Sequence, residues 1–491
     1  MAQQVIVIGS GFAGLSAACY LAEAGYAVTV LEKNKIPGGR ARKFEQDGFV
    51  FDMGPSWYWM PGVFEDFFSH FGKKVSDYYE LLRLDPSYQI FFEDNALMEV
   101  PASMDALYAM FEHYEPGSSK QLKKFLSEAA YKYEVGIKEF VRKPGHSILE
   151  FADMRVLKSM FRLQMFTSIS AHIRQLFKND KLIRLLEFPV LFLGATPQKT
   201  PALYSLMNYA DLALGTWYPQ GGMHKIIEGM LSLATELGVE IKTGHEVERL
   251  ETSLDRVSQV HTNQGVFQAD VVVGAADYHH VEQHLLDQDK RTYSEGYWQK
   301  RTMAPSSLLF YLGVEGRLKN LQHHNLFFDA DFERHAQEIY EDAAWPSDPL
   351  FYVCVPSITD PSVAPAGKEN VFVLIPLAPG LEDSENQREH YYNVVMERLE
   401  ARTGQDIRSK VIFKRSYAMR DFEKDYHAFK GNAYGLANTL LQTAFLKPKL
   451  KSKKVQNLYY AGQLTTPGPG VPPSLISGEV VAREIIKSNP V

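Results

Sequence analysis

An apolar strand that runs directly into a glycine-rich turn and then a helix opens this chain. Residues 5–14 read Val-Ile-Val-Ile-Gly-Ser-Gly-Phe-Ala-Gly. Gly9 suits a tight turn, Gly11 lets backbone approach a pyrophosphate, and Gly14 lets the helix pack closely on the strand. The pattern predicts a phosphate-binding β-α-β unit, with the phosphates at the positive end of the helix expected over residues 15–24.

The next segments indicate which dinucleotide this unit binds. A second expected strand, residues 26–31, ends at Glu32, where a carboxylate can accept hydrogen bonds from a ribose diol. This acid favours an adenosine without a 2′-phosphate. Arg40, in the Pro-Gly-Gly-Arg-Ala of residues 37–41, can reach a diphosphate with a planar fork of donors. Together with residues 51–56, this segment favours FAD over NAD, although Gly-Gly-Arg alone also occurs in plain surface turns.

The other end of the chain carries a matching motif. Residues 459–473 read Tyr-Tyr-Ala-Gly-Gln-Leu-Thr-Thr-Pro-Gly-Pro-Gly-Val-Pro-Pro and join an expected strand, residues 457–461, to a helix over about 473–486. Glycines allow close approach and prolines stiffen the turn. We expect the helix start and the amides of Val471 and Ser474 to face the part of a flavin ring that gains negative charge. A rigid loop before a helix is the alternative.

Composition narrows the class of protein. The 491 residues exceed what one core usually fills, so two domains are expected. The net charge of −7 gives no support to nucleic-acid binding, and two cysteines exclude a disulfide framework. No apolar run approaches the roughly 20 residues that span a bilayer, and residues 1–20 do not resemble a signal peptide. We therefore expect a cytoplasmic protein that meets a membrane only at its inner face.

The order of elements predicts an α/β fold with α+β insertions. We expect a discontinuous Rossmann-like FAD-binding domain of glutathione-reductase type, and a substrate-binding, membrane-associating domain made of a mixed sheet and helices. Residues 1–79, 219–282 and 456–491 are assigned to the first domain, and residues 80–218 and 283–455 to the second. The segment before residue 218 is expected to be helical. The remaining expected elements are a helix at 225–237, strands at 240–243, 257–262 and 271–275 that return to the nucleotide domain, strands at 306–314, 350–355 and 370–376, and a helix at 385–403.

Four motifs together resemble those of the bacterial phytoene desaturase family. They are residues 9–14, residues 37–41, the Gly-Thr-Trp-Tyr-Pro-Gln-Gly-Gly-Met of residues 215–223, and residues 459–473. This family is the carotenoid-desaturase branch of the FAD-dependent amine oxidase and protoporphyrinogen oxidase superfamily. The resemblance implies FAD-dependent desaturation of a long lipophilic polyene, phytoene stepwise towards lycopene, by hydride transfer to flavin N5. Oxygen or a quinone would then take the electrons.

The motifs and the resemblance imply two sets of contact residues. The expected cofactor contacts are Gly9, Ser10, Gly11, Phe12, Ala13, Gly14, Glu32, Lys33, Gly39, Arg40, Ala41, Gly54, Pro55, Ser56, Val247, Gly462, Gln463, Val471, Pro472 and Ile476. The expected substrate channel, where it meets the cofactor, is lined by Trp217, Tyr218, Gly222 and Met223. Plain core packing is the alternative for these aromatic residues.

The proton acceptor is less well specified. Asp153 and Arg155 could form an acidic and basic pair that stabilises a developing cation or takes the proton, but a solvated surface pair is the commoner arrangement. Asp211, on an otherwise apolar stretch, is a competing candidate, and ordinary helix polarity accounts for it equally well. The paired histidines 279–280 and 323–324 lack a recognised ligand spacing, so no metal is expected.

A hydrocarbon substrate resides in the membrane, which suggests a membrane contact. Apolar residues in 154–178 follow helical spacing beside basic residues, a composition that fits an interfacial helix and fits a core helix with a solvated face equally well. A second possible contact is the lysine group Lys447, Lys449, Lys451, Lys453 and Lys454.

Other activities remain open at this point. They are desaturation of a hydroxylated or cyclised carotenoid, of the hydroxycarotenoid 3,4-desaturase type, a carotenoid or retinoid isomerase or saturase, and an amine oxidase. A flavin-free prenyl-lipid carrier is the non-enzymatic alternative. It is disfavoured because such carriers lose the phosphate loop and the carboxy-terminal flavin contacts, and this chain keeps both.

Overall fold

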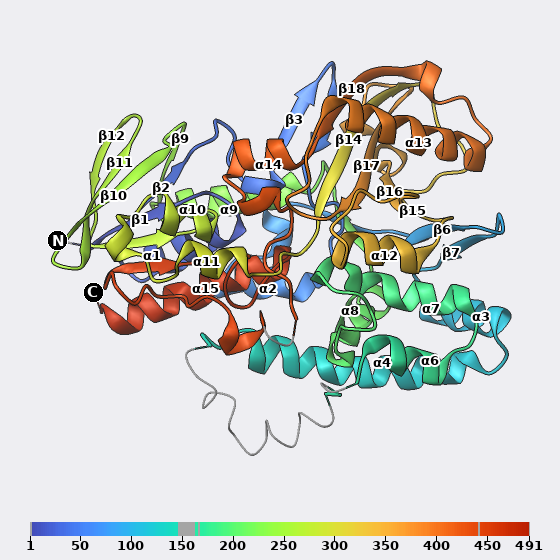
Figure 1. Cartoon of the computed structure of the whole chain (residues 1–491), viewed down its shortest axis with the longest axis horizontal. Coiled ribbons are helices and arrows are strands. Elements are labelled where there is room, and N and C mark those ends of the chain that lie inside the picture. The colour runs from blue at the N-terminus through green and yellow to red at the C-terminus, as the bar shows by residue number, and fades with distance from the viewer. Residues whose placement is uncertain (1, 146–162, 165–166, 440–441, 491) are drawn as a thin grey trace.

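The computed structural model of the chain describes residues 2–145, 163–164, 167–439 and 442–490. Two sheets organise it (Figure 1): a five-stranded sheet on the left of the view and a seven-stranded sheet at the upper right. Within the described residues, no helix combines the length and the apolar character that a bilayer crossing requires.

The five-stranded sheet is parallel throughout and is built from three separated parts of the chain. Its order is β19-β13-β1-β2-β9. The strands are β1 (Gln4–Ile8), β2 (Ala27–Glu32), β9 (Glu240–Thr243), β13 (Val271–Gly274) and β19 (Leu458–Tyr460). Each was expected within a residue or two. The inner strands β1 and β13 are nearly continuous apolar runs because both faces of a parallel sheet are covered, whereas the edge strand β9 is partly exposed.

The two ends of the chain meet through helices α1 (Phe12–Glu23) and α15 (Val471–Ser488). A Cβ on Gly478 would lie 2.3 Å from the carbonyl oxygen of Ala13, and the Ser16 hydroxyl donates to the Leu475 carbonyl over 2.8 Å. A Cβ on Gly14 would lie 2.0 Å from the carbonyl oxygen of Gly9. Both glycines are therefore required for close packing, as expected for Gly14.

One predicted strand pairs elsewhere. Strand β11 (Arg256–Thr262) forms a separate antiparallel sheet with β10 (Val247–Ser253) and β12 (Gly265–Gln268) and does not join the five-stranded sheet. That residues 257–262 belong to the nucleotide domain stays a prediction. Leu254 and Asp255, both with positive φ, make a tight turn between β10 and β11. Such a turn favours pairing with the adjacent strand in sequence over pairing with a distant one.

The seven-stranded sheet has the order β18-β14-β17-β16-β15-β6-β7. Its strands are β6 (Tyr88–Phe92), β7 (Leu97–Val100), β14 (Ser306–Glu315), β15 (His324–Phe328), β16 (Phe351–Cys354), β17 (Lys368–Leu377) and β18 (Val411–Tyr417). The three strands expected here are confirmed, as is helix α13 (Glu385–Thr403).

The purely helical character expected before residue 218 is wrong. Strands β6 and β7 enter the seven-stranded sheet, and β5 (Leu81–Arg83) pairs with β8 (Trp217–Pro219). Strand β6 is buried along its whole length, so it lacks the polar and apolar alternation that would identify it. Because β6 pairs with β15, we propose that residues 80–218 and 283–455 form one domain.

The remaining elements cover these sheets. They are β3 (Lys43–Gln46), β4 (Phe49–Asp52), α2 (Pro61–His70), α3 (Met104–Tyr114), α4 (Ser118–Val135), α6 (Ile169–Leu176), α7 (Asp180–Glu187), α8 (Leu206–Asn208), α9 (His224–Glu236), α10 (Tyr278–Gln283), α11 (Glu295–Gln299), α12 (Phe332–Tyr340) and α14 (Met419–Tyr426). Helices α3, α4, α6, α7 and α8 lie below the larger sheet in Figure 1.

Part of the expected interfacial helix is a core helix. Ile169, Ile173 and Phe177 are fully buried on the inner side of α6 and just beyond it. Residues 154–162 and 165–166 of that expected segment lie outside the described residues. The described part therefore packs against protein.

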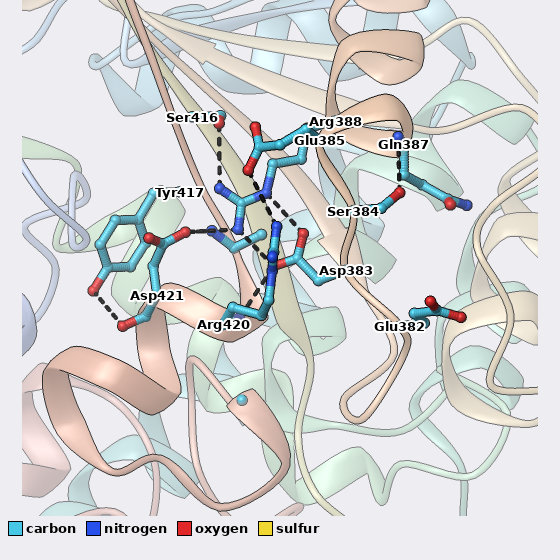
Figure 2. A network of polar contacts seen from close by, with 12 residues as sticks. Glu382, Asp383, Ser384, Glu385, Gln387, Arg388, Ser416, Tyr417, Arg420 and Asp421 are labelled. Atoms are coloured by element: carbon cyan, nitrogen blue, oxygen red, sulfur yellow. Dashed lines mark hydrogen bonds and ion pairs between the residues drawn. The ribbon is translucent and has the colours of Figure 1, made fainter.

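A network of ion pairs fixes helix α14 beside the larger sheet (Figure 2). The Arg388 guanidinium donates to both oxygens of Asp383, over 2.7 and 2.5 Å, and lies 2.7 Å from Asp421. It also donates to the Ser416 hydroxyl on β18, and Arg420 N donates to Asp383. Burial alone would raise the pKa of Asp383, but the hydrogen bonds from Arg388 and the Arg420 amide, together with the two arginine charges, lower the pKa. The network joins the starts of α13 and α14 to β18.

We expect Asp383→Asn to destabilise the protein strongly. Both side chains of the pair are almost completely buried, so neutralising Asp383 leaves the Arg388 cation undercompensated. Breaking such a pair typically costs about 3–5 kcal/mol. The free energy of unfolding from urea titration measures the loss. Glu382→Gln, at the exposed neighbouring position, is the matched control and should change it by less than about 0.5 kcal/mol. Equal effects of the two substitutions would contradict a stabilising role of the Asp383–Arg388 pair.

Candidate functional site

A cavity of about 1000 Å³ is lined by residues from both sheets. The glycine loop before α1, residues 38–41, residues 54–57 and the loop 462–476 line one part of it. The other part is lined by apolar side chains from residues 80–218 and 283–455, including Phe140, Leu163, Phe188, Leu206, Leu326 and Phe328. The cavity therefore has one region of backbone amides and polar groups and one that is almost purely hydrocarbon.

Glu32 is held in a fixed orientation at the polar end of the cavity. One of its carboxylate oxygens accepts from the amide and hydroxyl of Ser10, over 2.9 and 2.6 Å. The other accepts from the amide and side chain of Asn34, over 2.8 and 3.0 Å. Val247, at the start of β10, lines the cavity in the same region. This carboxylate has the position that a ribose-binding acid occupies at the end of the second strand.

Arg40 lines the cavity with an unused donor. Its guanidinium donates to the Asn432 carbonyl over 3.1 Å and lies 5.1 Å from the centre of the Tyr426 ring. Its buried Nε has no partner among the described residues. Burial lowers the pKa of Arg40, with the Asp277 carboxylate acting against it, and an arginine remains charged. A buried cation with a free N–H fits an anionic ligand such as a diphosphate.

The carboxy-terminal loop closes the opposite side of the polar region. Gly462 N donates to the Ser477 hydroxyl, which in turn donates to the Thr466 carbonyl. Helix α15 begins at Val471, two residues before the expected start. Ser474 N donates to the Gly470 carbonyl, so its amide is not free, contrary to expectation. The expected pair of amides, those of Val471 and Ser474, therefore reduces to that of Val471, and Pro472 and Pro473 have no N–H to add.

The structure brings the expected cofactor contacts together. Every one of them lines the cavity except Gly14, which lies behind Gly9 and serves packing. Residues that sequence reasoning missed also line this region: Asn34, Trp57, Trp59, Asp277, His280, Asp425, Tyr426 and His427. Trp57 adjoins the expected segment 54–56. Helix α14 lies more than 350 residues further along the chain, and no local sequence pattern predicts that it reaches this site.

The residues present fit FAD. A glycine loop precedes the start of α1, a carboxylate ends β2, Arg40 lines the cavity with an Nε that has no partner among the described residues, and α15 begins at the cavity wall. These are the elements that bind a ribose, a diphosphate and an electron-accepting ring.

The expected substrate-channel residues lie elsewhere. Trp217, Tyr218, Gly222 and Met223 do not line the main cavity, and Tyr218 and Met223 line a separate pocket of about 20 Å³. Strand β8 pairs with β5, and the following turn is fixed because Asp360 accepts from Tyr218 and Asp52 accepts from Met223 N. Local pairing and these carboxylates hold the turn away from the cavity.

Of the expected proton acceptors, Asp211 can be placed, and it does not line the cavity. Asp153 and Arg155 lie outside the described residues. Asp211 is buried behind Trp59: it accepts from Tyr88 over 2.7 Å and from Thr216 over 3.4 Å, and Trp59 Nε1 donates to Thr216. Burial raises the pKa of Asp211 to about 7. In this structure Asp211 is a buried structural carboxyl group.

One group of possible metal ligands occurs among the described residues. Atoms of His323, His324 and Cys354 lie within 4.8 Å of one another, and all three residues are buried. The Nδ1 atoms of the two histidines are already bonded, to Thr359 Oγ1 and to the Tyr352 hydroxyl respectively. Burial raises the pKa of Cys354 to about 12, so its thiol is protonated. The absence of a metal stays a prediction.

Comparison with known proteins extends these observations. Residues 12–486 match the flavin containing amine oxidoreductase family. The chain is 43% identical to a carotenoid 3,4-desaturase of Haloarcula japonica, over 99% of this chain and 98% of that protein. It is 31% identical to a zeta-carotene-forming phytoene desaturase of Myxococcus xanthus, over 99% and 94%. An oxidoreductase structure from Methanosarcina mazei shares the fold, with a TM-score of 0.62 and 16% identity over 98% and 100% of the two chains.

Asp211→Asn should change the pH dependence of stability. The pKa of this carboxyl group is about 7 in the folded protein and about 3.9 in the unfolded chain. Its contribution to the free energy of unfolding is therefore complete below about pH 4. This contribution is lost as the pH rises from about 4 through about 7, at about 1.4 kcal/mol per pH unit. Relative to the variant, the wild-type free energy of unfolding should fall by about 2 kcal/mol between pH 5 and 7 and level off above. Urea titrations across this range measure it, and parallel pH profiles would contradict it.

Proposed function

Because this chain belongs to the flavin-containing amine oxidoreductases and, within them, to the carotenoid desaturases, we propose that it desaturates a carotenoid with an oxygenated end group. It is an FAD-dependent oxidoreductase. The proposal on substrate goes further than the family. It rests on one side chain in the apolar part of the cavity, His335.

His335 carries a hydrogen-bond donor without a partner. The residue lines the cavity from α12 and is 2% exposed. Its Nδ1 accepts from Leu350 N over 3.3 Å, so in the neutral ring the proton is on Nε2. Burial lowers the pKa of His335 to about 4, which keeps the ring neutral at physiological pH. Nε2 has no partner among the described residues.

This donor distinguishes the two substrate classes. Leaving a buried N–H unsatisfied costs about 1–3 kcal/mol, whereas a hydroxyl or carbonyl oxygen on the substrate would accept its hydrogen bond. A pure hydrocarbon such as phytoene offers no acceptor. The higher identity to a carotenoid 3,4-desaturase than to a phytoene desaturase supports the same choice. Stepwise conversion of phytoene towards lycopene remains the second candidate, because most of the lining of this region is apolar.

The chain's own residues supply binding and exclusion of water. Removal of hydrogen from two adjacent carbons requires an acceptor of a hydride, which FAD supplies when bound. The apolar wall stabilises a polyene by roughly 25 cal/mol for each Å² that is removed from water. Trp57 is fixed at the junction of the two regions because its ring stacks on His324, with centroids 4.1 Å apart. The electron acceptor, oxygen or a quinone, stays a prediction.

Two variants of His335 test the substrate class. The assay compares a hydroxylated carotenoid with the hydrocarbon of the same chain length, using holoenzyme and substrate in liposomes. His335→Leu should lower kcat/KM for the hydroxylated substrate roughly three- to tenfold, the equivalent of one hydrogen bond. His335→Gln, which retains an N–H donor, should recover part of the loss. Ile339→Val, on the same helix and also at the cavity wall, is the control and should affect both substrates equally.

Two results would contradict the proposal. One is efficient desaturation of phytoene with no turnover of the hydroxylated carotenoid. The other is an equal loss on both substrates in His335→Leu, which would assign the side chain a packing role alone.

We also propose that the protein collects its substrate at a membrane surface. A carotenoid is insoluble in water, and the cavity lining extends to Leu446, which is 41% exposed. Two of the expected lysine contacts are unsuitable: Lys447 is buried, and Lys449 Nζ donates to the Gly145 carbonyl. Lys453 and Lys454 are exposed.

Vesicle flotation tests this membrane contact. Binding to vesicles that contain anionic lipid should exceed binding to neutral vesicles and should weaken as salt is added. Leu446→Ser should reduce binding to both kinds of vesicle, because it removes an apolar contact. The exposed Leu254 lies on the turn between β10 and β11, and Leu254→Ser is the matched control. No binding to either vesicle would overturn the proposal.

A further inference from the structure

A buried lysine lies directly behind the carboxy-terminal loop. Lys447 is 2% exposed, and its Nζ has no hydrogen-bond partner in the described part of the chain. A Cβ on Gly468 would lie 2.6 Å from this Nζ and 2.9 Å from Asn438 Oδ1. Asn438 Oδ1 is also buried and, within the described residues, unpaired. The amine and the amide oxygen therefore flank one glycine of the loop.

Lys447 lies behind the residues that form the cavity wall. Asn438, Pro467, Pro469 and Gly470 line the cavity, whereas Lys447 does not. Gly468 has φ +133°, and any side chain there would collide with the amine. The glycine therefore allows an amine to approach the back of the loop that faces the cofactor region.

Among the described residues, no charged group near Lys447 compensates a cation. The loop 462–470 contains no titratable side chain, and residues 434–446 contain only Tyr434, whose pKa is raised by burial. On the same segment as Lys447, Lys449 Nζ donates to the carbonyls of Gly145 and Phe445. Burial alone lowers the pKa of Lys447 to about 7. A change of charge next to this amine would therefore change its protonation near neutral pH.

We propose that Lys447 is a redox-linked proton site, neutral while the cofactor is oxidised and protonated once the cofactor has gained two electrons. Desaturation removes a hydride and a proton from two adjacent carbons and leaves a double bond. FAD takes the hydride and thereby gains one negative charge, and Lys447 takes up one proton, so the charges balance across the loop. The inference rests on the FAD assignment and is independent of which carotenoid is bound.

The test counts protons during anaerobic reduction of the holoenzyme. Midpoint potentials are measured from about pH 6 to 9 for wild type, Lys447→Met and Lys447→Arg. Above about pH 7 the wild type should take up one more proton per two electrons than either variant, which appears as a steeper slope of potential against pH. Below about pH 7 this excess should disappear, because Lys447 is then protonated in both redox states. Lys447→Arg, with a permanent charge, should have a higher potential than Lys447→Met at every pH.

Controls separate this role from a structural one. FAD content and thermal stability are recorded for each variant, and the exposed Lys453→Met should keep the wild-type proton count. A merely structural lysine would change stability without changing the slope. An unchanged slope in Lys447→Met overturns the proposal. If Lys447→Met does not retain FAD, Lys447→Arg decides: a wild-type slope overturns the proposal and a reduced slope supports it.

Discussion

The close contact between helices α1 and α15 is the constraint on which the cavity depends. Gly478 leaves no room for a side chain against Ala13, Ser16 and Ala17, so the first and last helices pack at backbone distance. Strand order β19-β13-β1 places the two ends of the chain in one sheet. As a result, the phosphate loop and the carboxy-terminal loop face the same space. A ligand that needs both can bind only after the whole chain has folded.

Helix α14, which is fixed beside the larger sheet, completes the polar end of the cavity. Arg42 pairs with Asp425, which also accepts from the Tyr417 hydroxyl on β18. Arg40 and Arg42 both lie over the Tyr426 ring. The Asp383–Arg388 network fixes the start of the same helix. A contact that looks peripheral to the cofactor thus sets the position of groups that line its site.

Local sequence signals predicted the nucleotide half well and the substrate half poorly. A glycine that must pass close to backbone, and a carboxylate that ends a strand, constrain their own neighbourhood, so Gly9, Gly14 and Glu32 were identifiable. Helix α13 was also found, because its length and capping are local. Strand β6 and helix α14 were missed, since their roles come from partners hundreds of residues away. The aromatic residues at 217–218 carried no signal that would distinguish a channel from a fixed turn.

Buried polar groups without a partner indicate which ligand chemistry the cavity accepts, which the fold alone does not specify. The M. mazei oxidoreductase shares this architecture at 16% identity, so architecture alone does not choose a substrate. A buried donor without a partner costs free energy in the folded protein, and a ligand that satisfies it recovers that cost. Arg40 Nε, His335 Nε2 and Lys447 Nζ are three such atoms, at the polar end, in the apolar region and behind the loop between them. Their chemistry differs: a fixed cation suits a diphosphate, a neutral N–H suits an oxygen on a hydrocarbon chain, and an amine that titrates near neutrality suits a ring whose charge changes. The cavity therefore specifies a charged, redox-active cofactor more strongly than it specifies one carotenoid.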